Sequence, residues 1–175
     1  MKKTLFTFLV LMVSLPVFSQ NVQVIGDSIF SLTVKERIKH NVKSEIFMSK
    51  TLCEVAKIQA ELILRTGTPT HTNPNPSLKS IDDRVKKFGY KGVAGENITY
   101  LSFNNESDYS LSKRAINNFM NSLGHRITLL SGDEIKNSND KTAYGQCILF
   151  DGKRKKIIVV QVFVSCSWDS DLLIE

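Results

Sequence analysis

Three side chains have the types and the neighbours of a ligand or metal site: His71, Glu96 and His125. Glu96 and His125 each follow a glycine and lie 29 residues apart, and His71 lies 25 residues before Glu96. Two imidazoles and a carboxylate hold zinc while leaving a fourth position for water. They donate lone pairs without cancelling all of the charge of the metal, so the remaining charge acidifies bound water. The three residues come from separate segments, so their spacing alone is a weak metal signal.

Each of these residues also has a plainer explanation. His71 lies among Thr, Asn and Pro residues and is compatible with a solvated loop. Glu96 is compatible with a buried carboxylate that accepts hydrogen bonds from backbone amides. His125, beside Arg126 at the expected end of a helix, is compatible with stabilising the negative pole of that helix. The remaining histidine, His40, lies in a polar helical stretch and is expected at the surface.

Periodicity predicts the elements that must position these residues. Apolar residues recur at helical spacing over 33–43 and 50–65, and the Pro-rich stretch 66–80 places His71 on a loop. Ser80 is expected to cap a short helix that ends before Gly89.

The second half of the chain predicts one helix and three strands. The helix is expected to begin after Ser110 or Ser112 and to end near Asn121, so that Gly124 sets His125 just beyond its C-terminus. Strands are predicted over 98–103, 143–150 and 156–164, the last two joined by a turn at Asp151-Gly152. This order suggests a sheet with helices packed on both sides.

The same residues fall in an order that resembles the CAP superfamily, the cysteine-rich secretory, antigen 5 and pathogenesis-related 1 proteins, also called SCP domains. The resemblance covers roughly residues 30–165. It is carried by Leu52, Ala56, Gln59 and Ala60, then His71, then Arg84 and Phe88-Gly89-Tyr90, then Gly95-Glu96-Asn97-Ile98, then Ala115, Phe119-Met120-Asn121-Ser122 and Gly124-His125-Arg126, and finally Gln161-Val162-Phe163.

The resemblance implies an α/β/α sandwich, with a mainly antiparallel central sheet and helices on both faces. It also implies a cleft lined by His71, Glu96, Ser122 and His125, of which His71, Glu96 and His125 would bind zinc or another divalent cation. Animal and plant members usually have a second glutamate at the position of Ser122, whereas bacterial members commonly have serine there, as this chain does. A site with one carboxylate fewer is expected to bind the ion more weakly.

For function, the resemblance favours a secreted binding or interaction module with an unknown small-molecule, lipid or cell-surface ligand. The alternative is a metal-assisted hydrolase acting on peptide or cell-envelope polymer, with Glu96 as ligand or general base. A third interpretation is a structural domain whose polar cluster only rigidifies the cleft. Ser122 and His125 have the types of a nucleophile and its base, but no Gly-x-Ser-x-Gly elbow accompanies them.

The first 20 residues resemble a secretory signal peptide. Lys2 and Lys3 precede an apolar run over 5–13, and cleavage is expected near Ser19 or Gln20. An uncleaved anchor is the other interpretation, although the run is shorter than the roughly 20 residues of a spanning helix. Residues 21–175 then form one domain, which we expect to be secreted or periplasmic, of bacterial type, monomeric and without a transmembrane segment.

Charge and cysteines add two expectations. The formal net charge of +6 falls to +4 once Lys2 and Lys3 leave, a surplus that gives solubility and does not imply nucleic acid. The basic run 153–156 is compatible with a solvated hairpin loop or with a contact to anionic polymer or lipid headgroups. An oxidising compartment permits one disulfide among Cys53, Cys147 and Cys166; we favour Cys147 with Cys166 and expect Cys53 to be a buried apolar residue.

Overall fold

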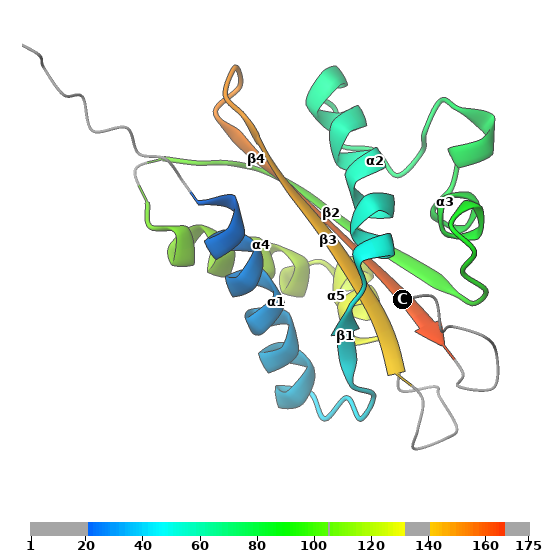
Figure 1. Cartoon of the computed structure of the whole chain (residues 1–175). Coiled ribbons are helices and arrows are strands. Elements are labelled where there is room, and N and C mark those ends of the chain that lie inside the picture. Colours follow the sequence, from blue (N-terminus) through cyan, green and yellow to red (C-terminus); the bar gives the residue numbers. More distant parts are fainter. Residues whose placement is uncertain (1–20, 105, 132–140, 167–175) are drawn as a thin grey trace, which may run out of the picture.

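The computed structural model describes residues 21–104, 106–131 and 141–166, which form helices on both faces of one sheet (Figure 1). The elements in chain order are α1 (Val22–Lys39), β1 (Ile46–Met48), α2 (Lys50–Thr66), the 3₁₀ turn η1 (Pro76–Leu78), α3 (Ile81–Lys87), β2 (Ala94–Ser102), α4 (Asp108–Asn121), α5 (Leu123–Leu130), β3 (Lys141–Asp151) and β4 (Lys156–Cys166).

The sheet has the strand order β1-β3-β4-β2, with β1 parallel to β3 and the other two pairings antiparallel. In β4, residues 157–160 and 162–164 are apolar and buried, which is the pattern of a strand covered on both faces. Gln161 interrupts this run, and its amide donates to the hydroxyls of Thr33 and Tyr144. The strand β2 lies at one edge of the sheet.

Two separate apolar cores lie against the two faces of the sheet. One joins α2 and α3 to the sheet through residues such as Ala56, Ile63 and Val85. The other joins α1, α4 and α5 to the opposite face through residues such as Ile29, Phe119 and Leu129. The predicted α/β/α sandwich with a mainly antiparallel sheet is therefore confirmed.

Several element boundaries differ from the predictions. The first helix begins at Val22 rather than near residue 33, because the Asn21 side chain accepts hydrogen bonds from two free amides of its first turn. The strand predicted over 98–103 begins at Ala94, so Glu96 lies within a strand. Ser107 caps α4 in place of Ser110 or Ser112.

The stretch after Asn121 also differs from the prediction, because the chain makes a second helix there. Ser122 separates α4 from α5, and Gly124 is a helical residue rather than a helix terminator. His125 therefore lies in the first turn of α5, at the positive pole of a helix, and cannot stabilise a negative pole.

The preferred disulfide between Cys147 and Cys166 is wrong. In the register of β3 and β4, Cys147 lies opposite Val160, whereas Cys166 lies opposite Lys141. Six residues along a strand correspond to about 20 Å, well beyond the roughly 7 Å limit between disulfide-linked Cα atoms. Cys53 and Cys147 are free thiols, and Cys53 is partly exposed rather than buried.

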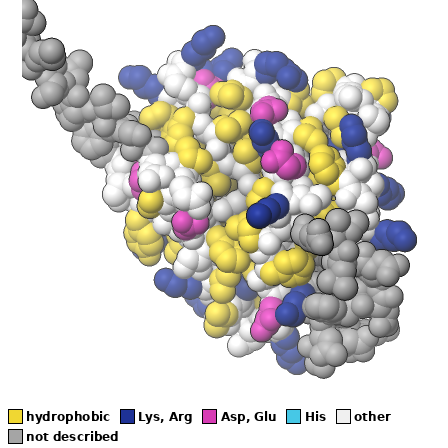
Figure 2. All heavy atoms as spheres, in the orientation of Figure 1, with side chains coloured by type: hydrophobic (Ala, Val, Ile, Leu, Met, Phe, Trp, Pro, Cys, Tyr) yellow, Lys and Arg dark blue, Asp and Glu magenta, His cyan; other side chains and the backbone are white. Residues whose placement is uncertain are grey.

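Lys and Arg side chains are spread over the face shown in Figure 2 rather than gathered into one patch. The basic run 153–156 covers the loop between β3 and β4 and the first residue of β4. In this loop Arg154 pairs with Asp151 and donates to the Leu64 carbonyl near the end of α2. The predicted leader lies outside the described residues. Within the described ranges, no helix combines the length and the apolar character needed to cross a membrane.

Gly145→Ala is expected to destabilise the fold, because α2 lies directly on β3 at this residue. A Cβ atom there would overlap the backbone of Leu52 and Cys53. We expect the free energy of unfolding to fall by about 1–3 kcal/mol or more, measured by urea denaturation. Gly124→Ala is the matched control, because a Cβ atom there meets open space. Equal stability of the two variants would contradict this packing.

Candidate functional site

Glu96 lies on the edge strand β2, where the layers on both faces of the sheet can reach it. Successive side chains of a strand point to opposite faces. Glu96 contacts Arg84 of α3 on one face, and the buried Asn97 donates to the carbonyl of His125 in α5 on the other. Gly95 permits this second contact, because a Cβ atom there would lie 2.7 Å from Thr128 of α5.

A buried ion pair fixes the Glu96 carboxylate. Arg84 Nη2 lies 2.5 Å from Glu96 Oε2, and the two side chains are 0% and 1% exposed. The other terminal nitrogen of Arg84 donates to the carbonyls of His71 and Leu78, at 3.3 and 3.1 Å. Removing one partner of such a buried pair costs about 3–5 kcal/mol, because the other charge is left uncompensated. Arg84 therefore joins α3, β2 and the loop that carries His71.

His71 lies on the loop after α2, as predicted, and its ring contacts Glu96. The distance from His71 Nδ1 to Glu96 Oε1 is 2.9 Å, while 58% of the His71 side chain is exposed. A carboxylate only accepts hydrogen bonds, so Nδ1 carries the proton and donates it. The neutral ring then keeps its lone pair on Nε2, on the side away from Glu96.

His125 brings the second imidazole to the same place from α5. Its ring centroid lies 6.5 Å from that of His71 and 5.4 Å from the ring of Phe119. Burial lowers the pKa of His125, and the nearby His71 lowers it further when that ring is charged. The Nδ1 atom of His125 is buried and has no hydrogen-bond partner among the described residues. The sheet edge thus brings together His71, Glu96 and His125, which we call the His–Glu cluster.

Ser122 lies between α4 and α5, and its side chain does not cap α5. No hydrogen bond joins its hydroxyl to His71 or His125 among the contacts of the described residues. The structure therefore gives no support to serine catalysis.

Of the three predicted metal ligands, His71 and His125 each keep a ring nitrogen without a hydrogen bond among the described residues. The described part of the chain contains no group of three or more His, Cys, Asp or Glu side chains placed to hold one metal. Both oxygens of Glu96 are occupied, by His71 and by Arg84. Metal-binding histidines usually donate their other ring N–H to a carboxylate or carbonyl, and Glu96 accepts such a bond from His71. His71 and His125 would hold the ion, with Glu96 supporting His71.

The helical periodicity of α3 also singles out Arg84, which the CAP resemblance includes without giving it a role. Ile81, Val85 and Phe88 form the apolar stripe of α3, and Arg84 occupies a position of the same stripe. A charged residue at a core position needs a buried partner. Asn97 lacks such a signal, because it lies outside the range predicted for β2.

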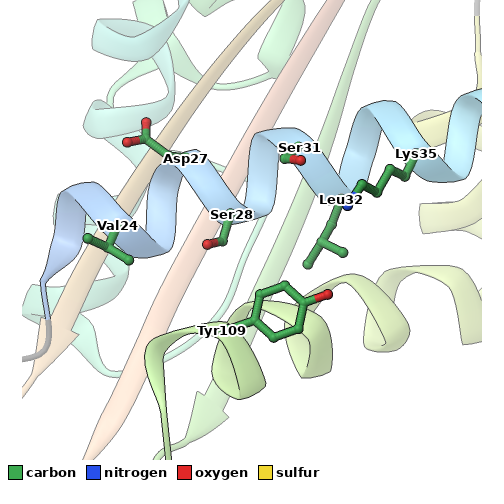
Figure 3. A pocket seen from close by; sticks show the side chains of 7 residues that line it. All are labelled: Val24, Asp27, Ser28, Ser31, Leu32, Lys35 and Tyr109. Atoms are coloured by element: carbon green, nitrogen blue, oxygen red, sulfur yellow. The ribbon is translucent and has the colours of Figure 1, made fainter.

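A pocket of about 290 Å³ lies away from the cluster, between α1 and α4 (Figure 3). Leu32 of α1 points toward the ring of Tyr109 on α4, and Ser28 lies on the same side of α1. The remaining lining residues are Val24, Asp27, Ser31 and Lys35. No sequence motif indicates this pocket.

His71→Ala is expected to raise the pKa of His125 toward its ordinary value of 6.5. Removing His71 removes a neighbouring positive charge and some burial, and both changes favour the charged form of His125. NMR titration of the His125 ring protons measures this shift. His40→Ala is the control and should leave the His125 titration unchanged. A His125 pKa that stays constant in His71→Ala would show that the rings do not interact.

Comparisons with other proteins bear on the fold. No protein-family model matches the chain, and no curated protein matches it. Among solved structures, the chain is similar to an outer surface protein from Borrelia burgdorferi, with a TM-score of 0.63 and 20% sequence identity. The similarity covers 84% of this chain and 96% of that one. At this identity it shows a common fold.

Proposed function

We propose that this protein is an exported binding module of the CAP type whose His–Glu cluster holds a divalent metal ion. The observation that carries the proposal is the hydrogen bond from His71 to Glu96, beside a second imidazole 6.5 Å away. That bond directs the Nε2 lone pair of His71 away from Glu96, and the Nδ1 atom of His125 has no competing hydrogen bond within the described ranges. Zinc or a similar ion suits two imidazole ligands.

Three further observations support the family and export parts of the proposal. The α/β/α sandwich agrees with what the CAP resemblance implies, and the residues that carry the resemblance at His71, Glu96 and His125 lie together. The structural neighbour is an outer surface protein. The first 20 residues have the charge and apolar pattern of a leader. The ligand that such a module recognises would be a small molecule, a lipid or a cell-surface component.

Zinc is expected to stabilise residues 21–175 against heat. An ion that binds only the folded state raises its stability by about 2.7 kcal/mol at one hundred times the dissociation constant. Differential scanning fluorimetry with increasing zinc measures the shift. His71→Ala and His125→Ala should each abolish it, whereas His40→Ala should retain it. A midpoint that zinc leaves unchanged in the parent protein would refute the metal-binding function.

A metal-assisted hydrolase is the second candidate, because two imidazoles, one of them oriented by a carboxylate, are a ligand set that can hold a water-activating ion. In that role His71 and His125 would hold the ion, which would supply Lewis-acid activation of water, and Glu96 would keep the His71 ring oriented. The described contacts of the cluster include no further carboxylate that could act as a separate acid.

A panel of peptide and cell-envelope polymer substrates separates the two candidates. If the cluster is catalytic, Glu96→Gln should lower turnover at least about tenfold, because the orienting carboxylate is lost. His40→Ala should leave turnover unchanged. Turnover that is equal in the parent and in Glu96→Gln would come from elsewhere, and zinc binding without turnover would favour the binding module.

A further inference from the structure

We infer that Arg84 is a positioning residue for His71, and that it keeps the Glu96 carboxylate out of the metal's ligand set so that a bound ion selects an anionic ligand. The claim about the anionic ligand, which we call the ligand part, rests on the proposed metal-binding function. The claim that Arg84 positions His71, which we call the positioning part, concerns the metal-free protein alone. Both parts start from the contacts of one guanidinium group.

Arg84 acts on both the backbone and the ring of His71. One terminal nitrogen donates to the His71 backbone carbonyl at 3.3 Å, which fixes the loop. The other binds Glu96 Oε2 at 2.5 Å, and Glu96 Oε1 accepts from the His71 ring at 2.9 Å. A guanidinium presents several donors in a rigid plane, whereas a lysine ammonium is a point charge on a flexible stem. Lysine at residue 84 could therefore replace the charge but not both contacts together.

The same contacts decide which atom of His71 is available. With Oε2 held by Arg84, Glu96 offers Oε1 as the acceptor for His71 Nδ1–H, and the ring remains in the Nδ1-protonated tautomer. Without Arg84, the carboxylate would be free to turn. It would then lose its fixed direction toward His71 and become available as a direct metal ligand.

The charge of the cluster gives the chemical class of the ligand. The charges of Arg84 and Glu96 compensate each other at 2.5 Å, and both side chains are buried. His71 and His125 are neutral when they bind a metal. A divalent ion held by these two rings would keep nearly all of its charge and several open positions. A carboxylate or phosphate group of a ligand would compensate that charge better than a neutral group.

The positioning part is tested by NMR of the imidazole nitrogens of the metal-free protein at pH 8. In the parent protein, we expect the His71 shifts of the Nδ1-protonated tautomer. Arg84→Lys should shift His71 toward a mixture of tautomers, and Glu96→Gln should do the same. Arg37→Lys is the matched control, because Arg37 is also buried and also donates to backbone carbonyls. It should lower stability and leave the His71 tautomer unchanged.

Two outcomes would overturn the positioning part. One is a parent His71 ring that is protonated on Nε2. The other is an Arg84→Lys variant that folds, as judged by circular dichroism, and keeps the parent tautomer. A variant that fails to fold is replaced by Glu96→Gln, which keeps the size of the side chain and removes its charge. Because no metal is used in this experiment, failure of the metal-binding function would not affect its result.

The ligand part is tested with cobalt(II), whose visible spectrum reports its ligands. Adding azide to the cobalt-loaded parent should give a new band, while the neutral ligand methanol at equal concentration should not. Arg84→Lys should weaken the azide effect, because the freed Glu96 carboxylate would then bind the ion and compensate its charge in place of azide. Absence of any azide band in the loaded parent, or an effect equal in Arg84→Lys, would contradict an anionic ligand. Failure of cobalt to bind at all would instead refute the proposed function.

Discussion

The site depends on one carboxylate that is held from two sides. Glu96 is buried on the edge strand β2, with Arg84 at one oxygen and His71 at the other. Burying two opposite charges is costly, and their attraction offsets the cost only when the remaining donors and acceptors are also satisfied. Here the other terminal nitrogen of Arg84 binds two carbonyls of the loop that carries His71, while its buried Nε has no hydrogen-bond partner among the described residues. The pair thus fixes α3, β2 and this loop together.

The edge of the sheet makes the convergence possible. In the middle of a sheet, residues on opposite faces are separated by the sheet itself. At β2, Glu96 meets the layer of α2 and α3, and its neighbour Asn97 meets α5 in the other layer. Gly95 lets α5 approach closely enough for His125 to reach the neighbourhood of His71. Within residues 95–97, Gly95 leaves room for α5, Glu96 binds Arg84 and His71, and Asn97 binds the backbone of α5.

Much of this arrangement is predictable from the sequence. The sandwich follows from element order, the loop position of His71 from its prolines, and the short helix α3 from Ser80, whose capping contacts the structure contains. The resemblance to CAP proteins names all three members of the cluster. The resemblance does not show which contacts these residues make, because those contacts join distant parts of the sequence. Glu96 binds His71, 25 residues before it, and Arg84, 12 residues before it. The helix α5 escapes prediction because a glycine such as Gly124 usually ends a helix, whereas here its backbone stays helical.

The central claim is that His71 and His125 share one ion while Glu96 remains with Arg84. A crystal structure of residues 21–175 with zinc, with anomalous data collected at the zinc edge, tests it most directly. The account predicts an anomalous peak about 2.0–2.1 Å from a nitrogen of each imidazole ring, with the Arg84–Glu96 contact intact. A peak bound by Glu96 with Arg84 turned away, or imidazole rings that point apart without zinc between them, would contradict it.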